Sequence, residues 1–247
     1  MEKVLIIADS HLESGVEPEP AYQLVKKVVK IIKFDRIVHL GDWLDLTMIS
    51  QWVDGKPGRV EGDRLSEELD LLRCEIKYFK KCCKSILLLE GNHDNRIEKI
   101  LDKYPVFKGT FPGLSEMCRE EKVDYVSLLK QPYKLLDDLF VTHGVSFSKY
   151  FFAQMIERAG VSMISGHAHR TGSYTFQYID GRVTTGYGLG TLGPVNPEYC
   201  AGQRITGHSQ SFGILYVEGS EWQLDIIYIK NRKCIIAGKA YSLEERC

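Results

Sequence analysis

The stretch VLIIADSH, residues 4–11, joins a short apolar run to a polar ending. Its first five residues are continuously apolar and mostly branched, which predicts a buried β-strand. The arrangement recurs at RIVHL, residues 36–40, which precedes GDWLD, and at SILLL, residues 85–89, which precedes a GNHD segment. Residues 19–32 and 66–84 separate these runs and have apolar residues at helical spacing. The N-terminal half therefore predicts alternating strands and helices of the βαβ type.

The remainder of the chain predicts strands of two kinds. Residues 139–142 and 161–165 are short apolar runs and predict two more buried strands. After Thr171, residues 173–185 and 211–229 are rich in β-branched and aromatic residues, which indicates antiparallel strands. Together with the N-terminal half, this pattern favours an α/β fold with two sheets packed face to face and helices outside.

One domain, residues 1–247, is expected, and two irregular segments stand apart within it. Residues 47–63 are rich in turn formers, and residues 103–131 contain several prolines and glycines. Long irregular loops in a compact domain often act as lids over a site. A tolerated surface insertion is an equally good interpretation of each segment.

The composition is that of a globular protein. The hydrophobic fraction is 44%, the charged fraction is 26%, and the formal net charge is −1. These values exclude a disordered chain, a collagen and a coiled coil, and they disfavour binding of nucleic acid through a broad basic surface. The seven cysteines include no C-x-x-C pair. Because the first apolar run is too short for a signal peptide and no run could span a membrane, we expect a cytoplasmic protein without membrane contact.

The histidines gather where the predicted strands end. Five of the seven follow a strand directly, and two aspartates and an asparagine accompany them. A lone histidine at a strand end is usually a hydrogen-bonded core residue, but together these side chains resemble the shell of a metal centre. Imidazole, carboxylate and amide ligands without thiolate favour manganese, iron or similar ions over a cysteine-rich zinc site. The set is large enough for two ions, which can act as a clamp for in-line attack on phosphorus.

The order of the motifs is more specific than any one of them. D-x-H, G-D-x-x-D, G-N-H-D, H-G and G-H-x-H occur in this order within residues 4–170, each after a predicted strand. In this respect the chain resembles the calcineurin-like metallophosphoesterase superfamily. The resemblance implies a four-layer αββα sandwich with two mixed β-sheets and a metal site at the carboxyl ends of the strands.

The resemblance also implies roles for individual residues. The ligands of the first ion would be Asp9, His11 and His169. Those of the second ion would be Asn92, His143 and His167, with Asp42 bridging the two. His93 would stabilise the transition state and protonate the leaving oxygen, and Asp45 would orient His93. The two divalent ions would be Mn²⁺ in the first instance, with Fe, Ni, Mg or Zn as alternatives.

The chain departs from the phosphoprotein phosphatase branch, which has an arginine after G-D-x-x-D and a glutamate after G-N-H. Here the corresponding residues are Leu46 and Asp94, so the chain is closer to the G-N-H-D group, which includes phosphodiesterases of nucleotides and nucleic acid. Arg96 and Arg170 are candidate substrate contacts, and a solvent-exposed position is a slightly better interpretation of Arg96. Three aromatic residues could stack a base, although aromatics near a pocket are more often core: Trp52, Tyr150 and Phe151.

The expected function is therefore that of a dimetal phosphoester hydrolase. A phosphodiesterase acting on a nucleotide or short nucleic acid is the first hypothesis. A phosphomonoesterase, including a phosphoprotein phosphatase, is the alternative within enzymes. A non-catalytic scaffold of the same fold is a distant third hypothesis, because scaffolds tend to lose the residues that are present here. The sequence gives no indication of the oligomeric state.

Overall fold

The computed structural model describes residues 1–197, 200 and 206–243. Its largest sheet has six strands in the order β11-β10-β1-β2-β3-β4. The strands are β1 (Glu2–Ile7), β2 (Arg36–His39), β3 (Ser85–Leu89), β4 (Asp124–Val126), β10 (Gln210–Glu218) and β11 (Glu221–Ile229). Strands β1 to β4 are parallel, whereas β10 and β11 form an antiparallel hairpin beside β1. The parallel half of the sheet therefore directs four strand ends to one edge.

The second sheet has five strands in the order β5-β6-β7-β9-β8. Its strands are β5 (Tyr133–Lys134), β6 (Leu139–Thr142), β7 (Ser162–Ser165), β8 (Gly172–Gln177) and β9 (Val183–Gly188). Strands β6, β7 and β9 are parallel, while β5 and β8 pair antiparallel at the edges. A separate hairpin of β12 (Lys233–Ile236) and β13 (Lys239–Ser242) follows β11.

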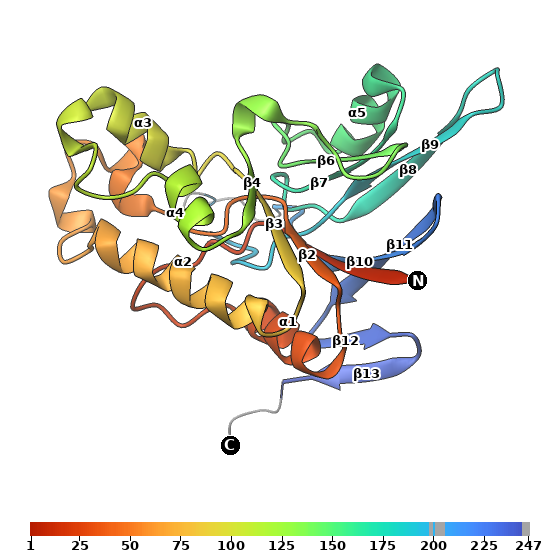
Figure 1. Cartoon of the computed structure of the whole chain (residues 1–247), viewed down its shortest axis with the longest axis horizontal. Coiled ribbons are helices and arrows are strands. Elements are labelled where there is room, and N and C mark those ends of the chain that lie inside the picture. The colour runs from red at the N-terminus through yellow and green to blue at the C-terminus, as the bar shows by residue number, and fades with distance from the viewer. Residues whose placement is uncertain (198–199, 201–205, 244–247) are drawn as a thin grey trace.

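Five α-helices complete the described part of the chain. They are α1 (Pro20–Ile31), α2 (Leu65–Lys80), α3 (Arg96–Lys103), α4 (Leu114–Glu120) and α5 (Phe151–Ala159). Figure 1 shows α1 and α2 on the outer side of the first sheet and α5 on the outer side of the second. The layers are thus helix, sheet, sheet and helix, and the predicted αββα sandwich is confirmed.

Strand β1 shows why the sequence forms these layers. Successive side chains of a strand point to opposite faces. Leu5 and Ile7 belong to the core between the first sheet and its helices. Val4 and Ile6 belong to the core between the two sheets. A continuous apolar run is therefore required, because both faces of the strand are buried.

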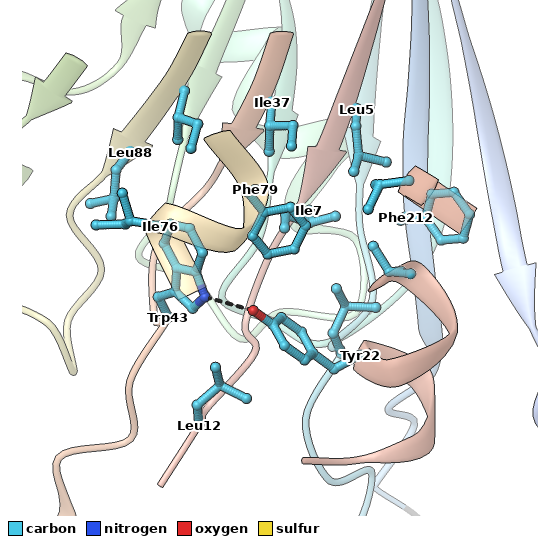
Figure 2. Packing of buried hydrophobic residues seen from close by; sticks show 14 of the residues in the cluster. Leu5, Ile7, Leu12, Tyr22, Ile37, Trp43, Ile76, Phe79, Leu88 and Phe212 are labelled. Atoms are coloured by element: carbon cyan, nitrogen blue, oxygen red, sulfur yellow. Dashed lines mark hydrogen bonds between the residues drawn. The ribbon is translucent and has the colours of Figure 1, made fainter. Parts of the chain in front are cut away.

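The core beneath the helices also supports the site. Trp43 lies among Tyr22, Phe79 and neighbouring apolar side chains, as Figure 2 shows. Its Nε1–H donates to the Tyr22 hydroxyl at 3.1 Å, and that hydroxyl donates to Glu75 Oε2 at 2.8 Å. Trp43 comes directly after Asp42, so this buried contact fixes the backbone at a candidate ligand.

The segment 103–131 is more regular than its sequence predicts. It contains α4, whose buried Leu114, Met117 and Cys118 have helical spacing, and the short strand β4. Proline and glycine on either side obscured this pattern, and a strand of three residues gives almost no periodic signal. The segment 47–63 consists of short 3₁₀ turns at Thr47–Ile49, Gln51–Val53 and Pro57–Arg59. No helix in the described ranges is long and apolar enough to cross a membrane.

Candidate metal centre

The candidate ligands gather where strands of the two sheets end. Five of the seven have a left-handed backbone: Asp9, His11, Asp42, His167 and His169, with φ between 44° and 67°. This conformation costs an L-residue of this kind about 1–2 kcal/mol. It persists because long-range contacts fix it, such as the hydrogen bonds from the Asp9 N–H to the Gly41 carbonyl and from the His11 N–H to the Asp42 carbonyl. Local strain of this kind is typical of functional sites.

The first group brings together Asp9, His11 and His169. His11 Nε2 lies 3.0 Å from His169 Nε2, and His169 Nε2 lies 3.5 Å from Asp9 Oδ1. All three side chains are almost fully buried. Asp9 also accepts the His167 N–H at 2.9 Å through Oδ2, so the same carboxylate connects the end of β1 with the loop after β7.

The second group brings together Asp42, Asn92, His143 and His167. His143 Nε2 lies 3.4 Å from Asp42 Oδ2, 3.1 Å from His167 Nδ1 and 3.0 Å from Asn92 Oδ1. Asp42 Oδ2 is also 4.0 Å from His11 Nε2 of the first group. One carboxylate oxygen therefore lies between the two groups, where a bridging ligand would be.

Hydrogen bonds to the outer ring nitrogens determine which nitrogens face inward as acceptors. His143 Nδ1 lies 2.9 Å from the Leu40 carbonyl, and His11 Nδ1 lies 3.0 Å from Asp45 Oδ1. Since a carbonyl and a carboxylate only accept, each Nδ1 carries a hydrogen, and in the neutral ring each Nε2 has a lone pair that faces the centre.

The donor set fits two divalent ions. His11 Nε2 and His169 Nε2 lie 3.0 Å apart, a distance at which two lone pairs would repel unless a cation or a proton lay between them. Ligand atoms at right angles around one octahedral ion, about 2.1 Å from it, are about 3 Å apart. Burial by itself would lower the pKa of His143, but the charge and hydrogen bond of Asp42, together with the charges of Asp9 and Asp94, outweigh burial and raise the pKa to about 9. The carboxylates thus favour positive charge in this centre.

His93 lies beside the two groups and has its own supports. Its Nδ1 is 2.9 Å from the Asp45 carbonyl and 3.1 Å from Asp45 Oδ1. Burial alone would lower the pKa of His93, but the charge of Asp42 together with the hydrogen bond and charge of Asp45 outweighs burial and raises the pKa above its ordinary value. Burial would raise the pKa of Asp45, but hydrogen bonds from His11 and His93 hold it far below its ordinary value. Asp45 therefore remains a carboxylate between two histidines.

Arg96 does not simply face solvent. Its Nη2 lies 3.2 Å from His93 Nε2, and its Nη1 donates to the Asp45 carbonyl at 2.6 Å. Arg170 is half-buried and donates through Nη2 to the Thr206 carbonyl at 3.0 Å. Both guanidinium groups therefore have their positions set by main-chain carbonyls next to the centre.

Asp94 has a role that its place in the motif did not reveal. Its buried carboxylate accepts the N–H groups of Asp42, Trp43, Leu44 and Gly91 at 2.7 to 3.4 Å. It thereby ties together the loops after β2 and β3. Burial, followed by the charge of Asp42, raises the pKa of Asp94 to about 7, against the N–H donors that favour the carboxylate.

Two histidines outside the motifs also reach the centre. His39 Nδ1 accepts the Gly41 N–H at 3.2 Å, so its Nε2–H donates to Ser10 Oγ at 2.9 Å. Burial lowers the pKa of His39 to about 3, which keeps this ring neutral. The His208 ring lies 4.9 Å from the His169 ring. No sequence signal marks His208, because only the pairing of β10 with β1 brings it here.

The aromatic candidates divide by exposure. Phe151 is buried, and a Cβ at Gly188 would lie 2.6 Å from its ring, so it is a core residue. Trp52 and Tyr150 are exposed. Phe147, which no motif marks in the sequence, is 68% exposed, and its ring centroid lies 4.2 Å from that of His167.

This centre and the fold around it define a metal-dependent phosphoesterase. The sequence model of the calcineurin-like phosphoesterase family matches residues 2–171, and the chain belongs to that family. The Gene 54 protein of Mycobacterium phage D29 is 23% identical to the chain over 266 residues, which cover 98% of this chain and 99% of that protein.

Several solved structures are similar to this chain. Vacuolar protein sorting 29 from Cryptosporidium parvum is 15% identical, with 98% of each chain covered and a TM-score of 0.49. A nuclease MPE from Pseudomonas putida is 12% identical, with 97% of this chain and 87% of that chain covered and a TM-score of 0.40. A dimetal phosphatase from Danio rerio is 13% identical, with 91% of this chain and 95% of that chain covered and a TM-score of 0.41.

Proposed function

We propose that the protein is a dimetal phosphodiesterase that hydrolyses nucleotides or short nucleic acids within a single domain. The observation that carries the proposal is the small number of arginine donors that the chain directs at a substrate phosphate beside the centre. Position 46 is a buried leucine, and Arg96 and Arg170 already donate to main-chain carbonyls. A phosphodiester brings one negative charge, whereas a monoester dianion brings close to two at pH 7. The site therefore suits the less charged group.

In this proposal Asp9, His11 and His169 hold one ion and Asn92, His143 and His167 hold the other, with Asp42 between them. When bound, the two ions would supply Lewis-acid stabilisation of the phosphate and activation of the attacking water. Mn²⁺ is the ion that we propose, because imidazole and oxygen donors without thiolate suit it.

His93 would act on the leaving group. Asp45 holds Nδ1 of the ring, which leaves Nε2 to donate a proton to the leaving oxygen. Arg96 donates through Nη1 to the Asp45 carbonyl, so it would contact an oxygen of the same phosphate through Nη2. That contact would take Nη2 away from His93 Nε2, which must itself carry a proton to act as an acid. Segment 47–63 begins two residues after Asp45, and Leu128 and Gln131 of segment 103–131 donate hydrogen bonds to Glu90, two residues before Asn92. Both segments are proposed to cover the substrate.

The test compares bis-p-nitrophenyl phosphate with p-nitrophenyl phosphate in the presence of Mn²⁺. We expect the higher kcat/KM for the diester, and a clear preference for the monoester would overturn the diesterase proposal. His93→Asn should retain its metal content and lose about 10²-fold or more in kcat. Full activity in that variant would remove His93 from the proposed chemistry.

The proposed location is the cytoplasm. The described cysteines are free thiols, and Cys74 is exposed among them. Thiols of this kind persist in a reducing compartment.

A further inference from the structure

The loop between β6 and α5 exposes apolar side chains next to the candidate metal centre. It begins directly after His143, and Val145, Phe147 and Tyr150 are 87%, 68% and 58% exposed. Folding gains little from apolar groups left in water, so they do not stabilise the core. Their position beside a ligand-bearing strand end is instead typical of a surface that contacts substrate.

Phe147 is the member of this loop that touches the centre. Its ring lies 4.2 Å from the His167 ring, with an interplanar angle of 40°. His167 in turn lies 4.9 Å from His143, ring to ring. Phe147 therefore lies at the outer edge of the second ligand group. Because the residue is 68% exposed, a large part of the ring remains open to a ligand.

The loop holds Phe147 in place from both ends. Gly144 has a φ of +99°, and a Cβ there would lie 2.5 Å from Ser165 Oγ, so the turn after His143 requires glycine. On the other side, the Phe151 N–H donates to the Ser148 carbonyl at 3.2 Å, and Phe151 itself is buried. Within the loop the Ser148 N–H donates to Ser146 Oγ at 3.2 Å. A platform that is ordered before binding loses little conformational entropy when a ligand stacks on it.

We propose that Phe147 forms a nucleobase-binding subsite beside the metal centre, so that the substrate is a nucleoside phosphate. The proposal rests on the proposed phosphoesterase function and names the substrate class of that same site. A phenyl ring offers no hydrogen bond, so recognition would be by stacking and would accept any of the bases. Such stacking is worth about 1–3 kcal/mol per base by alanine substitution, or about 5- to 150-fold in binding.

Two diesters with the same leaving group test the subsite on the manganese-loaded protein. One is the p-nitrophenyl ester of thymidine 5′-monophosphate, and the other is methyl p-nitrophenyl phosphate, which lacks a base. For Phe147→Ala we expect kcat/KM to fall about 5- to 150-fold with the thymidine ester and to change less than twofold with the methyl ester. Phe147→Trp, which keeps an aromatic ring, should have a kcat/KM for the thymidine ester close to that of the wild type. Ile179→Ala, at an exposed apolar residue in the turn between β8 and β9, should leave kcat/KM for both esters unchanged.

A binding measurement keeps the test independent of turnover. Calorimetry should show that Phe147→Ala weakens the binding of thymidine 5′-monophosphate by the same factor of about 5 to 150. The binding of ribose 5-phosphate should be unchanged. Equal losses with both diesters would mean that Phe147 only supports His167, and no loss with either would mean that it contacts no substrate. Each of these results would overturn the subsite. A wild-type preference for p-nitrophenyl phosphate would instead overturn the diesterase proposal, while the binding comparison would still decide the subsite.

Discussion

Asp45→Asn removes one negative charge from the carboxylate that two histidines share. Asp45 Oδ1 lies 3.0 Å from His11 Nδ1 and 3.1 Å from His93 Nδ1, and Oδ2 accepts from the Thr47 hydroxyl. An asparagine can keep its oxygen toward the histidines and turn its amide toward the Thr47 oxygen. The shape and the number of hydrogen bonds are then preserved, and only the charge is lost.

The size of the effect follows from these two contacts. Hydrogen bonds to charged groups contribute about 1.5–3 kcal/mol, and those between neutral groups contribute about 0.5–1.5 kcal/mol. Each contact therefore loses about 1 to 1.5 kcal/mol, or about tenfold in an equilibrium or rate constant. Through His11 the loss should weaken Mn²⁺ binding, within the range of about 10- to 100-fold known for residues behind metal ligands. Through His93 it should lower kcat about tenfold at saturating Mn²⁺.

Mn²⁺ titration calorimetry and diesterase kinetics at saturating metal separate these two effects. Asp102→Asn serves as the matched control, because the Asp102 side chain is 81% exposed and its distance to Lys108 Nζ is 3.7 Å. It should change neither quantity by more than twofold. If Asp45→Asn binds Mn²⁺ and turns over within twofold of the wild type, the proposed orientation of His11 and His93 by Asp45 is refuted.

Three further changes have defined outcomes. Burial raises the pKa of Glu68 to about 7, so the contribution of Glu68 to stability falls as the pH rises from its ordinary pKa toward 7. The free energy of unfolding of Glu68→Gln, measured with urea, should therefore exceed that of the wild type by roughly 1–3 kcal/mol at pH 8 and by almost nothing at pH 4.5. Gly91→Ala would bring a Cβ within 2.1 Å of Asp42 Oδ1, so diesterase activity and Mn²⁺ binding should both fall at least tenfold. Tyr22→Phe leaves the buried Trp43 Nε1–H without its acceptor and should lower the free energy of unfolding by about 1–3 kcal/mol.

Each of these outcomes has its own control. A pH-independent difference between Glu68→Gln and the wild type would contradict the raised pKa. Gly58→Ala places a Cβ in open space and should leave Mn²⁺ binding unchanged. Normal Mn²⁺ binding by Gly91→Ala would show that Asp42 tolerates the intrusion. Tyr78→Phe removes a hydroxyl that donates to the Lys26 carbonyl at 2.8 Å in a less buried position, and it should cost less than Tyr22→Phe.

The sequence by itself determined the family, the layers and the side chains that gather at the centre. Short apolar runs such as 4–8 and 85–89 are typical of strands buried on both faces, and parallel strands of this kind end at one edge. Residues that follow these runs must therefore meet, whatever the details of the loops. For this reason the order of the strands and their endings was enough to place Asp9, Asp42 and Asn92 together, although their role as ligands remains a prediction.

Only the tertiary structure decided how these side chains are held and what surrounds them. The left-handed backbone at Asp9 and Asp42 would be unfavourable in isolation, and hydrogen bonds between distant loops maintain it. The direction of Arg96, the approach of His208 and the exposed ring of Phe147 likewise depend on neighbours far away in the chain. Local propensity carries no information about such contacts, because their energy appears only when the two sheets pack and their loops meet.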